Sequence, residues 1–377
     1  MSLKKSGTWT LLILGGLLLG LLTACGGDDP TATSAPATAA PTTAPTPLDL
    51  LVKAAEEEGV LNLLGSGDFH STAFIKDVQD GVNAMYGINI KINVSPGPSG
   101  SQLLPTLISE YEAKRPASTD LFTGASARQG LGLHTAGAAM IFDWAALAPH
   151  LAPIEIGTDN SGVVVAGTIH GMGYNTDLIS EAELPKKFTD FADPKYKGKI
   201  ATTPYAVGWI EASIVLGKEE ALKTIKTMTD NGAIAGLIGC GQEDRIASGE
   251  FAFMAFSCGE ITWKRLAEKG APVAWKMLEE FVSGTAVDAT IPKNSEHPNL
   301  AALVAIFLTT EEGQALIWEH TGNPSPYREG TYTQGVIKDL EAAGTTVYYG
   351  THENIGKYME NYTSFAFGQI VPLLRGG

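Results

Sequence analysis

The chain has 377 residues, of which 44 % are hydrophobic, so it can build one or two substantial cores and is not mainly disordered. Its 26 Lys and Arg are outnumbered by 41 Asp and Glu, and the formal charge of −15 argues against sequence-independent binding to nucleic acid or an anionic lipid surface. With only three Cys, neither a disulfide-dense miniprotein nor a multi-cysteine metal scaffold is expected.

Residues 1–24 have the pattern of a secretory signal peptide. Lys4 and Lys5 precede the apolar run Leu11–Leu22, which is shorter than the roughly 20 residues that span a bilayer. The run ends in Leu22-Thr23-Ala24-Cys25, which resembles the lipobox of bacterial lipoproteins. This resemblance implies that Cys25 is lipidated and that its acyl chains hold an exported protein at the outer face of the cytoplasmic membrane.

Residues 25–47 are predicted to form a tether. After Cys25 the segment is dominated by Thr, Ala and Pro, with no large apolar side chain before Leu48. Such a composition cannot build a core and favours an extended, semi-flexible chain. The globular body is therefore expected to begin at Leu48.

Three units of strand, small-residue loop and helix begin the body. Their strands and loops are Val60–Leu64 with Gly65–His70, Ile88–Val94 with Ser95–Ser101, and Asp120–Phe122 with Thr123–Ser126. Three such units predict an α/β fold with a mainly parallel sheet. Ligands of such sheets bind beyond the carboxyl ends of the strands, so the loops predict a pocket, although small residues at strand ends also occur for steric reasons. None of the loops matches a nucleotide-binding glycine motif.

A second α/β region begins at the Val-rich strand Gly162–Ile169. Ile200–Pro204 and Phe251–Phe256 are further predicted strands, and Phe281–Ile291 is extended again. A strongly apolar helix is predicted over Pro298–Thr310.

Five segments resemble, in order, those of the extracellular solute-binding proteins of ABC importers, in the branch that contains ferric-iron, thiamine, polyamine and phosphonate binders. They are Tyr174–Leu178, Leu184–Ile200, Ala247–Phe251, Ala289–Asn299 and Leu308–Gln314. The resemblance implies a two-lobed, periplasmic-binding-protein-like α/β fold with a hinge and an interlobe ligand cleft. Lobe 1 would comprise residues 48–161 plus 290–377, and lobe 2 residues 162–289.

The resemblance also implies a function. The protein would be a membrane-anchored receptor that captures a small molecule by hinge closure and delivers it to the membrane permease of an ABC importer. We expect a monomer that is not an enzyme, uses no cofactor, holds no metal and binds no nucleic acid.

Hydroxyls and adjacent amides at strand ends or helix starts are the expected ligand contacts of lobe 1: Ser66, Gly67, Asp68, Ser99, Ser101, Thr123 and Ser126. This set suits a small organic anion, because unpaired N–H groups at helix N-termini carry partial positive charge. The matching positions of lobe 2 are Tyr174, Thr203, Tyr205, Ser257, Cys258 and Trp263. Their aromatic rings offer apolar faces with a polar handle, and ordinary packing is the alternative interpretation of each ring.

Other ligands stay open, and so do two other functions, an exported hydrolase and a structural or adhesive lipoprotein. Ferric-iron binders of this family carry paired tyrosines after the strand that ends here at Phe256, whereas this chain has Ser257 and Cys258, and so lacks the phenolate ligands of a hard metal ion. A polyamine or thiamine-like cation would need Asp68, Glu260 or Asp288 to face an aromatic wall. An exported hydrolase is disfavoured, since the sequence has no GxSxG, SxxK or HExxH motif.

A disulfide is predicted between Cys240 and Cys258. Both residues follow predicted strands of lobe 2, and the exported setting permits oxidation. Two free, buried thiols are the alternative.

Overall fold

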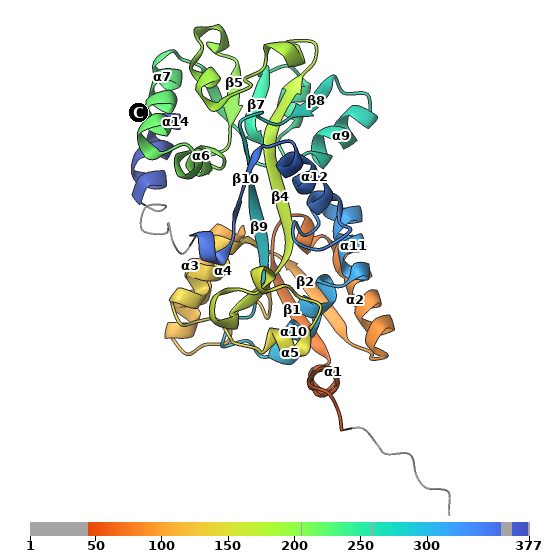
Figure 1. The fold of residues 1–377 in the computed structure, drawn as a ribbon. Coiled ribbons are helices and arrows are strands. Elements are labelled where there is room, and N and C mark those ends of the chain that lie inside the picture. Colours follow the sequence, from red (N-terminus) through yellow and green to blue (C-terminus); the bar gives the residue numbers. More distant parts are fainter. Residues whose placement is uncertain (1–43, 205, 258, 356–363, 376–377) are drawn as a thin grey trace, which may run out of the picture. The chain divides into compact units, whose positions relative to one another are not determined.

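A computed structural model describes residues 44–204, 206–257, 259–355 and 364–375. The chain divides into two units, Met1–Ala44 and Pro45–Gly377, and every element below belongs to the second unit (Figure 1). The predicted signal peptide and the predicted lipidation site Cys25 lie outside the described residues.

The folded unit alternates strands and helices. Its helices are α1 (Pro47–Glu58), α2 (Thr72–Tyr86), α3 (Gly100–Glu112), α4 (Ala127–Thr135), α5 (Trp144–Leu147), α6 (Trp209–Val215), α7 (Lys218–Asp230), α8 (Asp244–Ala247), α9 (Ile261–Glu268), α10 (Pro298–Leu308), α11 (Glu311–Thr321), α12 (Tyr332–Ala342) and α14 (Val371–Leu374). Its strands are β1 (Val60–Gly65), β2 (Lys91–Pro96), β3 (Phe122–Ser126), β4 (Gly162–Asn175), β5 (Ile200–Thr202), β6 (Ile234–Leu237), β7 (Phe253–Ser257), β8 (Val273–Lys276), β9 (Phe281–Thr290) and β10 (Thr346–Gly350).

The strands form two sheets. β1 and β2 are a parallel pair, and the other strands follow the order β10-β9-β4-β7-β5-β6, with β3 paired to β9 and β8 to β4. The second sheet is mixed rather than mainly parallel, because β4 is antiparallel to β7, β8 and β9. The predicted third loop, Thr123–Ser126, is itself part of β3, because it pairs antiparallel with β9.

Two large hydrophobic cores define two lobes. The core of lobe 1 joins side chains of α1, α2, β1 and β2 with those of α10, whose residues Leu300–Leu308 are all buried. The core of lobe 2 is aromatic and includes Phe188, Phe191, Trp209 and Phe253. β4 and β9 run side by side and contribute side chains to both cores, so they connect the lobes (Figure 1).

The C-terminal segment differs from the predicted division, which gave all of residues 290–377 to lobe 1. Phe365, Ile370 and Leu374 are buried in the core of lobe 2, and α14 packs near α7. These apolar side chains place the segment on lobe 2, because lobe 2 offers the apolar surface that covers them. β10, which precedes the segment, pairs in parallel with β9.

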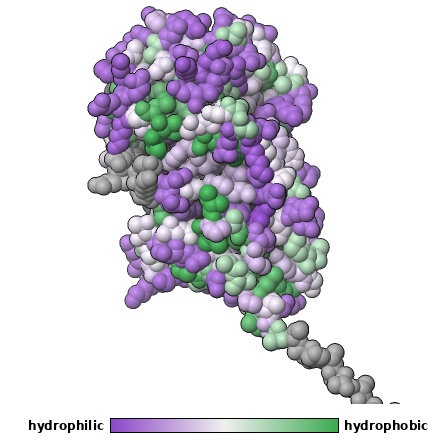
Figure 2. All heavy atoms as spheres, viewed as in Figure 1, coloured by the Kyte–Doolittle hydropathy of each residue, from purple (hydrophilic) through white to green (hydrophobic). Residues whose placement is uncertain are grey.

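On the face shown in Figure 2, hydrophilic side chains gather at one end, and hydrophobic side chains form smaller patches between other polar areas. The large hydrophobic side chains that are exposed in the described residues are Leu50, Met85, Ile141, Ile154, Leu178 and Tyr332. Within the same residues, no single helix has the length and apolarity of a membrane span, and one bent pair, α10 with α11, meets those criteria jointly.

His170 in the middle of β4 predicts a loss of stability in acid. Its side chain is buried, with hydroxyls of Thr168, Ser283 and Thr285 at 3.3 Å, and burial lowers its pKa to about 3. In the unfolded chain the imidazole has an ordinary pKa near 6.5. Between pH 6.5 and pH 3 the unfolded state therefore binds a proton that the native state excludes, and stability falls as the pH falls.

We expect His170 to lower the free energy of unfolding by about 2 kcal/mol between pH 7 and pH 5. Urea unfolding of the wild type and of His170→Gln at both pH values measures this contribution. The variant should lose less stability than the wild type over this range. The same loss in both proteins would show that His170 is not responsible.

Candidate functional site

A cavity of about 510 Å³ lies between the two lobes. Lobe 1 contributes Ser66, Gly67, Ser99, Gly100, Ser101, Gly124, Ser126, Arg128 and Gln129; lobe 2 contributes Val207, Glu211 and Cys240; and Thr285, Tyr348, Gly350 and Ile355 come from β9, β10 and the segment after β10. A ligand in this cavity would therefore contact both lobes and the strands that connect them.

The lobe 1 wall contains the start of two helices. Ser99 caps α3, where the side chain of Gln102 accepts hydrogen bonds from the Ser99 amide at 3.3 Å and from its hydroxyl at 3.1 Å. Ser126 precedes α4, and its hydroxyl donates to the side chain of Gln129. The first N–H groups of a helix have no carbonyl partner within the helix, and they carry the positive end of its dipole. This wall suits a carboxylate, phosphate or phosphonate.

Charged side chains complete the lining. Arg128 is half-buried in the first turn of α4, on the lobe 1 side. Glu211 is buried on the lobe 2 side, where its Oε2 accepts a hydrogen bond from the N–H of Gly208, at 2.6 Å from the nitrogen. Among the described residues that line the cavity, Arg128 is the only cation and Glu211 the only anion.

Glu243 of lobe 2 and Asp68 of lobe 1 do not line the cavity. The pKa of Glu243 is raised mainly by its burial, against which a hydrogen bond from the Gly241 amide acts, and the negative charges of Asp244 and then of Asp68 raise it further. Asp68 itself is exposed in the short turn after β1.

Five predicted contacts of lobe 1 line the cavity: Ser66, Gly67, Ser99, Ser101 and Ser126. Asp68 and Thr123 are not among the lining residues. Thr123 is buried because the segment predicted to be a loop is part of strand β3, and its hydroxyl has no hydrogen-bond partner among the residues that the structure describes.

The four predicted contacts of lobe 2 that lie within the described residues are not among the lining residues of the cavity. Tyr174 is buried in the core of lobe 2, and burial raises its pKa. Ser257 and Trp263 are buried together, since the indole N–H of Trp263 donates to the Ser257 hydroxyl at 3.0 Å and that of Trp275 donates to it at 3.2 Å. Two tryptophans thus cover the end of β7. Thr203 is fully buried, and Tyr205 and Cys258 lie outside the described residues.

Sequence reasoning missed several lining residues. Arg128 lies two residues after the predicted Ser126, so the helical pattern after this loop was a usable signal. Glu211 lies in the first turn of α6, two residues after Trp209. Tyr348 and Thr285 come from strands whose pairing joins distant parts of the chain, and no local pattern marks them as cavity residues.

Cys240 lines the cavity and is disulfide-bonded. Its predicted partner, Cys258, lies outside the described residues, so the pairing stays a prediction. If it is correct, alkylation of the unreduced, denatured protein should leave Cys240 and Cys258 unmodified, as mass spectrometry would show. Reduction should lower the free energy of unfolding by about 3 kcal/mol, because a loop of this length is then released. Finding both residues alkylated would contradict the pairing.

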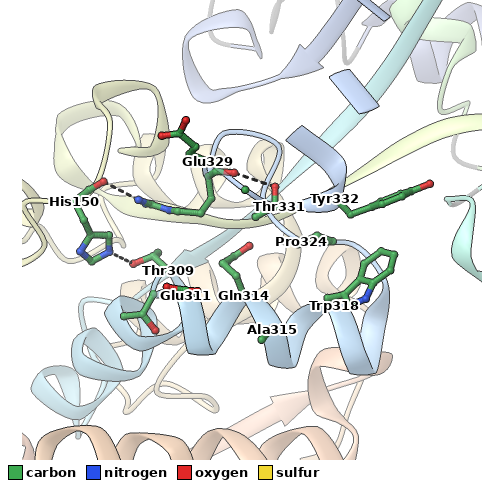
Figure 3. Close-up of a pocket in the computed structure, with 13 residues that line it drawn as sticks. His150, Thr309, Glu311, Gln314, Ala315, Trp318, Pro324, Glu329, Thr331 and Tyr332 are labelled. Carbon is green, nitrogen blue, oxygen red and sulfur yellow. Dashed lines mark hydrogen bonds between the residues drawn. The ribbon is translucent and has the colours of Figure 1, made fainter. Parts of the chain in front are cut away.

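A second cavity, of about 750 Å³, lies along α11 of lobe 1 (Figure 3). One face of α11, the loop before α12 and His150 form its walls. It is larger than the cavity between the lobes, but its lining takes no residue from the core of lobe 2 or from the connecting strands. A ligand there would not bridge the lobes, so we take the smaller cavity as the candidate functional site.

The described residues offer few ligands for a metal ion or an organic cation. Among the described residues, no group of three or more His, Cys, Asp and Glu side chains is placed to hold a metal ion, and Tyr348 is the only phenol lining the cavity. Two of the carboxylates that a cation would need are engaged elsewhere. Glu260 accepts a hydrogen bond from the hydroxyl of Tyr332. Asp288 is buried and is hydrogen-bonded to His352.

Comparison with known proteins gives a match over most of the chain. Residues 80–345 match the family model described as bacterial extracellular solute-binding protein. Two curated relatives, the major ferric iron-binding proteins of Neisseria meningitidis serogroup A and serogroup B strains, are 27 % identical over 224 residues. The match covers 53 % of this chain and 64 % of the relatives, so the chain spans less than two thirds of their length.

Solved structures share the fold. The substrate-binding protein of an ABC transporter from Agrobacterium tumefaciens has a TM-score of 0.67 at 16 % identity, over 85 % of this chain and 97 % of its own. The ferric binding protein from Campylobacter jejuni has a TM-score of 0.64 at 17 % identity, over 83 % and 99 %. AgtB from A. tumefaciens, in complex with agropinic acid, has a TM-score of 0.62 at 15 % identity, over 83 % and 98 %. The expected two-lobed α/β fold is confirmed.

Proposed function

The chain belongs to the family of bacterial extracellular solute-binding proteins, and from this premise we propose that it captures a small solute in the cavity between its lobes and delivers it to the permease of an ABC importer. The observation that carries the proposal is the lining of the cavity by both lobes, by the connecting strand β9 and by β10, which pairs with β9. Solute contacts from both sides would stabilise a closed arrangement, which the permease can distinguish from the open one. In this role the protein is a receptor and not an enzyme.

We favour a small organic anion as the solute. The starts of α3 and α4 and the guanidinium of Arg128 supply positive potential on one wall. The Ser side chains of the same wall can both donate and accept hydrogen bonds. Glu211, across the cavity, would accept a hydrogen bond from a hydroxyl or amine elsewhere on the solute.

The proposed location is the outer face of the cytoplasmic membrane, with a lipid on Cys25 and a single copy of the chain as the working form. The pattern of residues 1–47 supports the anchor. Metabolic labelling with a radioactive fatty acid should mark the wild type and leave Cys25→Ser unmarked.

A thermal-shift screen tests the receptor function. Organic acids, phosphonates, amines, vitamins and ferric complexes form separate panels. A ligand that binds only the native state at 100 times its Kd adds about 2.7 kcal/mol of stability. We expect stabilisation by members of the organic acid or phosphonate panel. Stabilisation by amines alone would contradict the proposal that the solute is an anion. If no compound in any panel stabilised the protein, the proposal that it is a receptor for these solutes would be contradicted.

Ferric iron is the second candidate, because the curated relatives are ferric iron-binding proteins by name. The described lining offers the Tyr348 phenol and the Glu211 carboxylate as hard oxygen ligands. Stabilisation by ferric salts and by ferric complexes of different chelators, but not by the free chelators, would replace the organic anion with iron.

A further inference from the structure

The cavity and helix α12 lie on opposite faces of the connecting strands. In β10, Tyr348 lines the cavity between the lobes, whereas its neighbours Val347 and Tyr349 line a smaller hollow together with Gln334 and Ile337 of α12. Successive side chains of a strand point to opposite faces. The connecting strands therefore separate the cavity from α12, and Figure 1 shows α9, α11 and α12 on the side away from α3, α4 and α6.

The two lobes are hydrogen-bonded to each other on the α12 side. The Tyr332 hydroxyl, at the start of α12, donates to Glu260 Oε2 at 2.5 Å. The Arg265 guanidinium of α9 donates from Nη2 to the carbonyl oxygen of Glu319 at 2.7 Å, in the last turn of α11. A cation at this position also suits the negative end of the α11 dipole.

Each partner is fixed within its own lobe. α9 packs by Trp263 into the apolar cluster of β5, β7 and β8 in lobe 2. The end of α11 is fixed in lobe 1, where His320 Nε2 is 2.8 Å from Asp77 Oδ2 of α2. The ring of Tyr332 packs on Trp318 of α11, with 4.7 Å between centroids (Figure 3).

Close packing accompanies these hydrogen bonds. Gly322 ends α11 with φ 71, and a Cβ atom there would lie 2.1 Å from Ile261 Cγ2. A Cβ atom at Gly259 would lie 2.8 Å from Asn323 Oδ1. The start of α9 and the end of α11 are thus in direct contact.

We propose that these contacts form a latch that opposes closure of the cavity; the latch consists of the pairs Tyr332–Glu260, Arg265–Glu319 and Ile261–Gly322. A rotation about the connecting strands that narrows the cavity moves groups on the opposite face apart. Closure therefore has to break the latch, and the latch reduces the closed fraction of the unliganded protein. Since apparent affinity scales with the fraction of protein in the binding-competent state, the latch sets solute affinity without touching the solute. This role rests on the proposed receptor function.

The test measures lobe separation without any solute. Nitroxide labels on Glu112→Cys in α3 and Lys223→Cys in α7, both exposed, report the distance across the cavity side by double electron–electron resonance. The double variant Arg265→Met/Tyr332→Phe removes the hydrogen bonds that both side chains donate across the lobes and keeps the Tyr332 ring. Lys264→Ala, at an exposed position of the same helix, is the matched control.

We expect the ratio of short to long distances to rise about fivefold or more in the double variant, as the loss of these hydrogen bonds predicts, and to stay unchanged in the control. A cooperative thermal melting transition serves as the control that the double variant is folded. A folded double variant with the distance distribution of the wild type, or with longer distances, would overturn the latch. The thermal-shift screen tests the receptor function separately, so a silent screen with a changed distance ratio would reject the receptor and retain the latch.

Discussion

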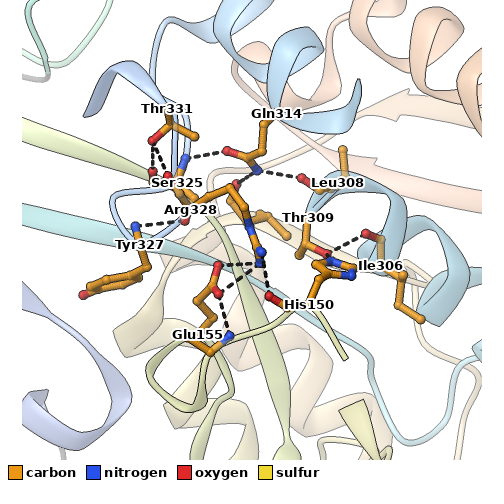
Figure 4. Close-up of polar contacts among 12 residues, drawn as sticks. His150, Glu155, Ile306, Leu308, Thr309, Gln314, Ser325, Tyr327, Arg328 and Thr331 are labelled. Atoms are coloured by element: carbon orange, nitrogen blue, oxygen red, sulfur yellow. Dashed lines mark hydrogen bonds and ion pairs between the residues drawn. The ribbon is translucent and has the colours of Figure 1, made fainter. Parts of the chain in front are cut away.

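Replacement of Arg328 by Met should lower the free energy of unfolding by about 3–5 kcal/mol, because it leaves a buried charge without its partner. Arg328 Nη2 donates to both carboxylate oxygens of Glu155, at 2.8 and 3.0 Å, and Nη1 donates to the carbonyl oxygen of His150 at 2.7 Å (Figure 4). The side chain of Glu155 is only 2 % exposed. Burial raises the pKa of Glu155, whereas the hydrogen bond from the Ala152 amide and the positive charge of Arg328 lower it.

Urea unfolding at pH 7 measures this loss, with Lys338→Met at an exposed position of α12 as the control. The double variant Glu155→Gln/Arg328→Met should recover part of the loss, because no charge is then buried. Without the guanidinium the native pKa of Glu155 rises further, so the native state takes up the proton first and the deficit of Arg328→Met should shrink as the pH falls toward 5. A loss no larger than that of the control would show that the pair contributes little.

Replacement of Arg128 by Met should weaken solute binding by about 30-fold or more, since truncation of a buried charge contact costs about 2–5 kcal/mol. Arg128 is the only cation among the described residues of the cavity between the lobes. Met keeps the length and apolar stem of the side chain and removes its charge and donors.

Calorimetric titration with the compound that gives the largest thermal shift measures this effect. Arg115→Met, which removes an exposed guanidinium at the end of α3, is the matched control. Equal affinities of Arg128→Met and Arg115→Met would show that the anion is not bound by Arg128. Unchanged affinity would then also remove the main argument for an anionic solute.

The lobe 1 side of the site could be predicted because its signals are local. Each of Ser66, Ser99 and Ser126 stands at the end of an apolar strand pattern and just before a helical one, and all three line the cavity. Capping marks such a helix start: the side chain of Gln102 accepts hydrogen bonds from both the amide and the hydroxyl of Ser99, the residue that precedes α3.

The lobe 2 side could not be predicted because burial there depends on distant residues. Ser257 ends a strand as Ser126 does, yet the indoles of Trp263 and Trp275 cover it. Trp275 belongs to β8, which reaches this place by pairing with β4. The return of the C-terminal segment to lobe 2 is equally non-local, since it depends on β10 pairing with β9 and on apolar surface that α7 offers. A sequence pattern shows that a residue is polar at a strand end, but not which neighbour will cover it.

The central claim is that the solute binds between the lobes, and hydrogen–deuterium exchange with and without a stabilising compound tests it most directly. We predict protection in peptides that cover residues 66–70, 99–104, 126–131 and 207–211, from both walls of the cavity. Protection confined to residues 309–332 would place the compound in the cavity along α11 and contradict the account.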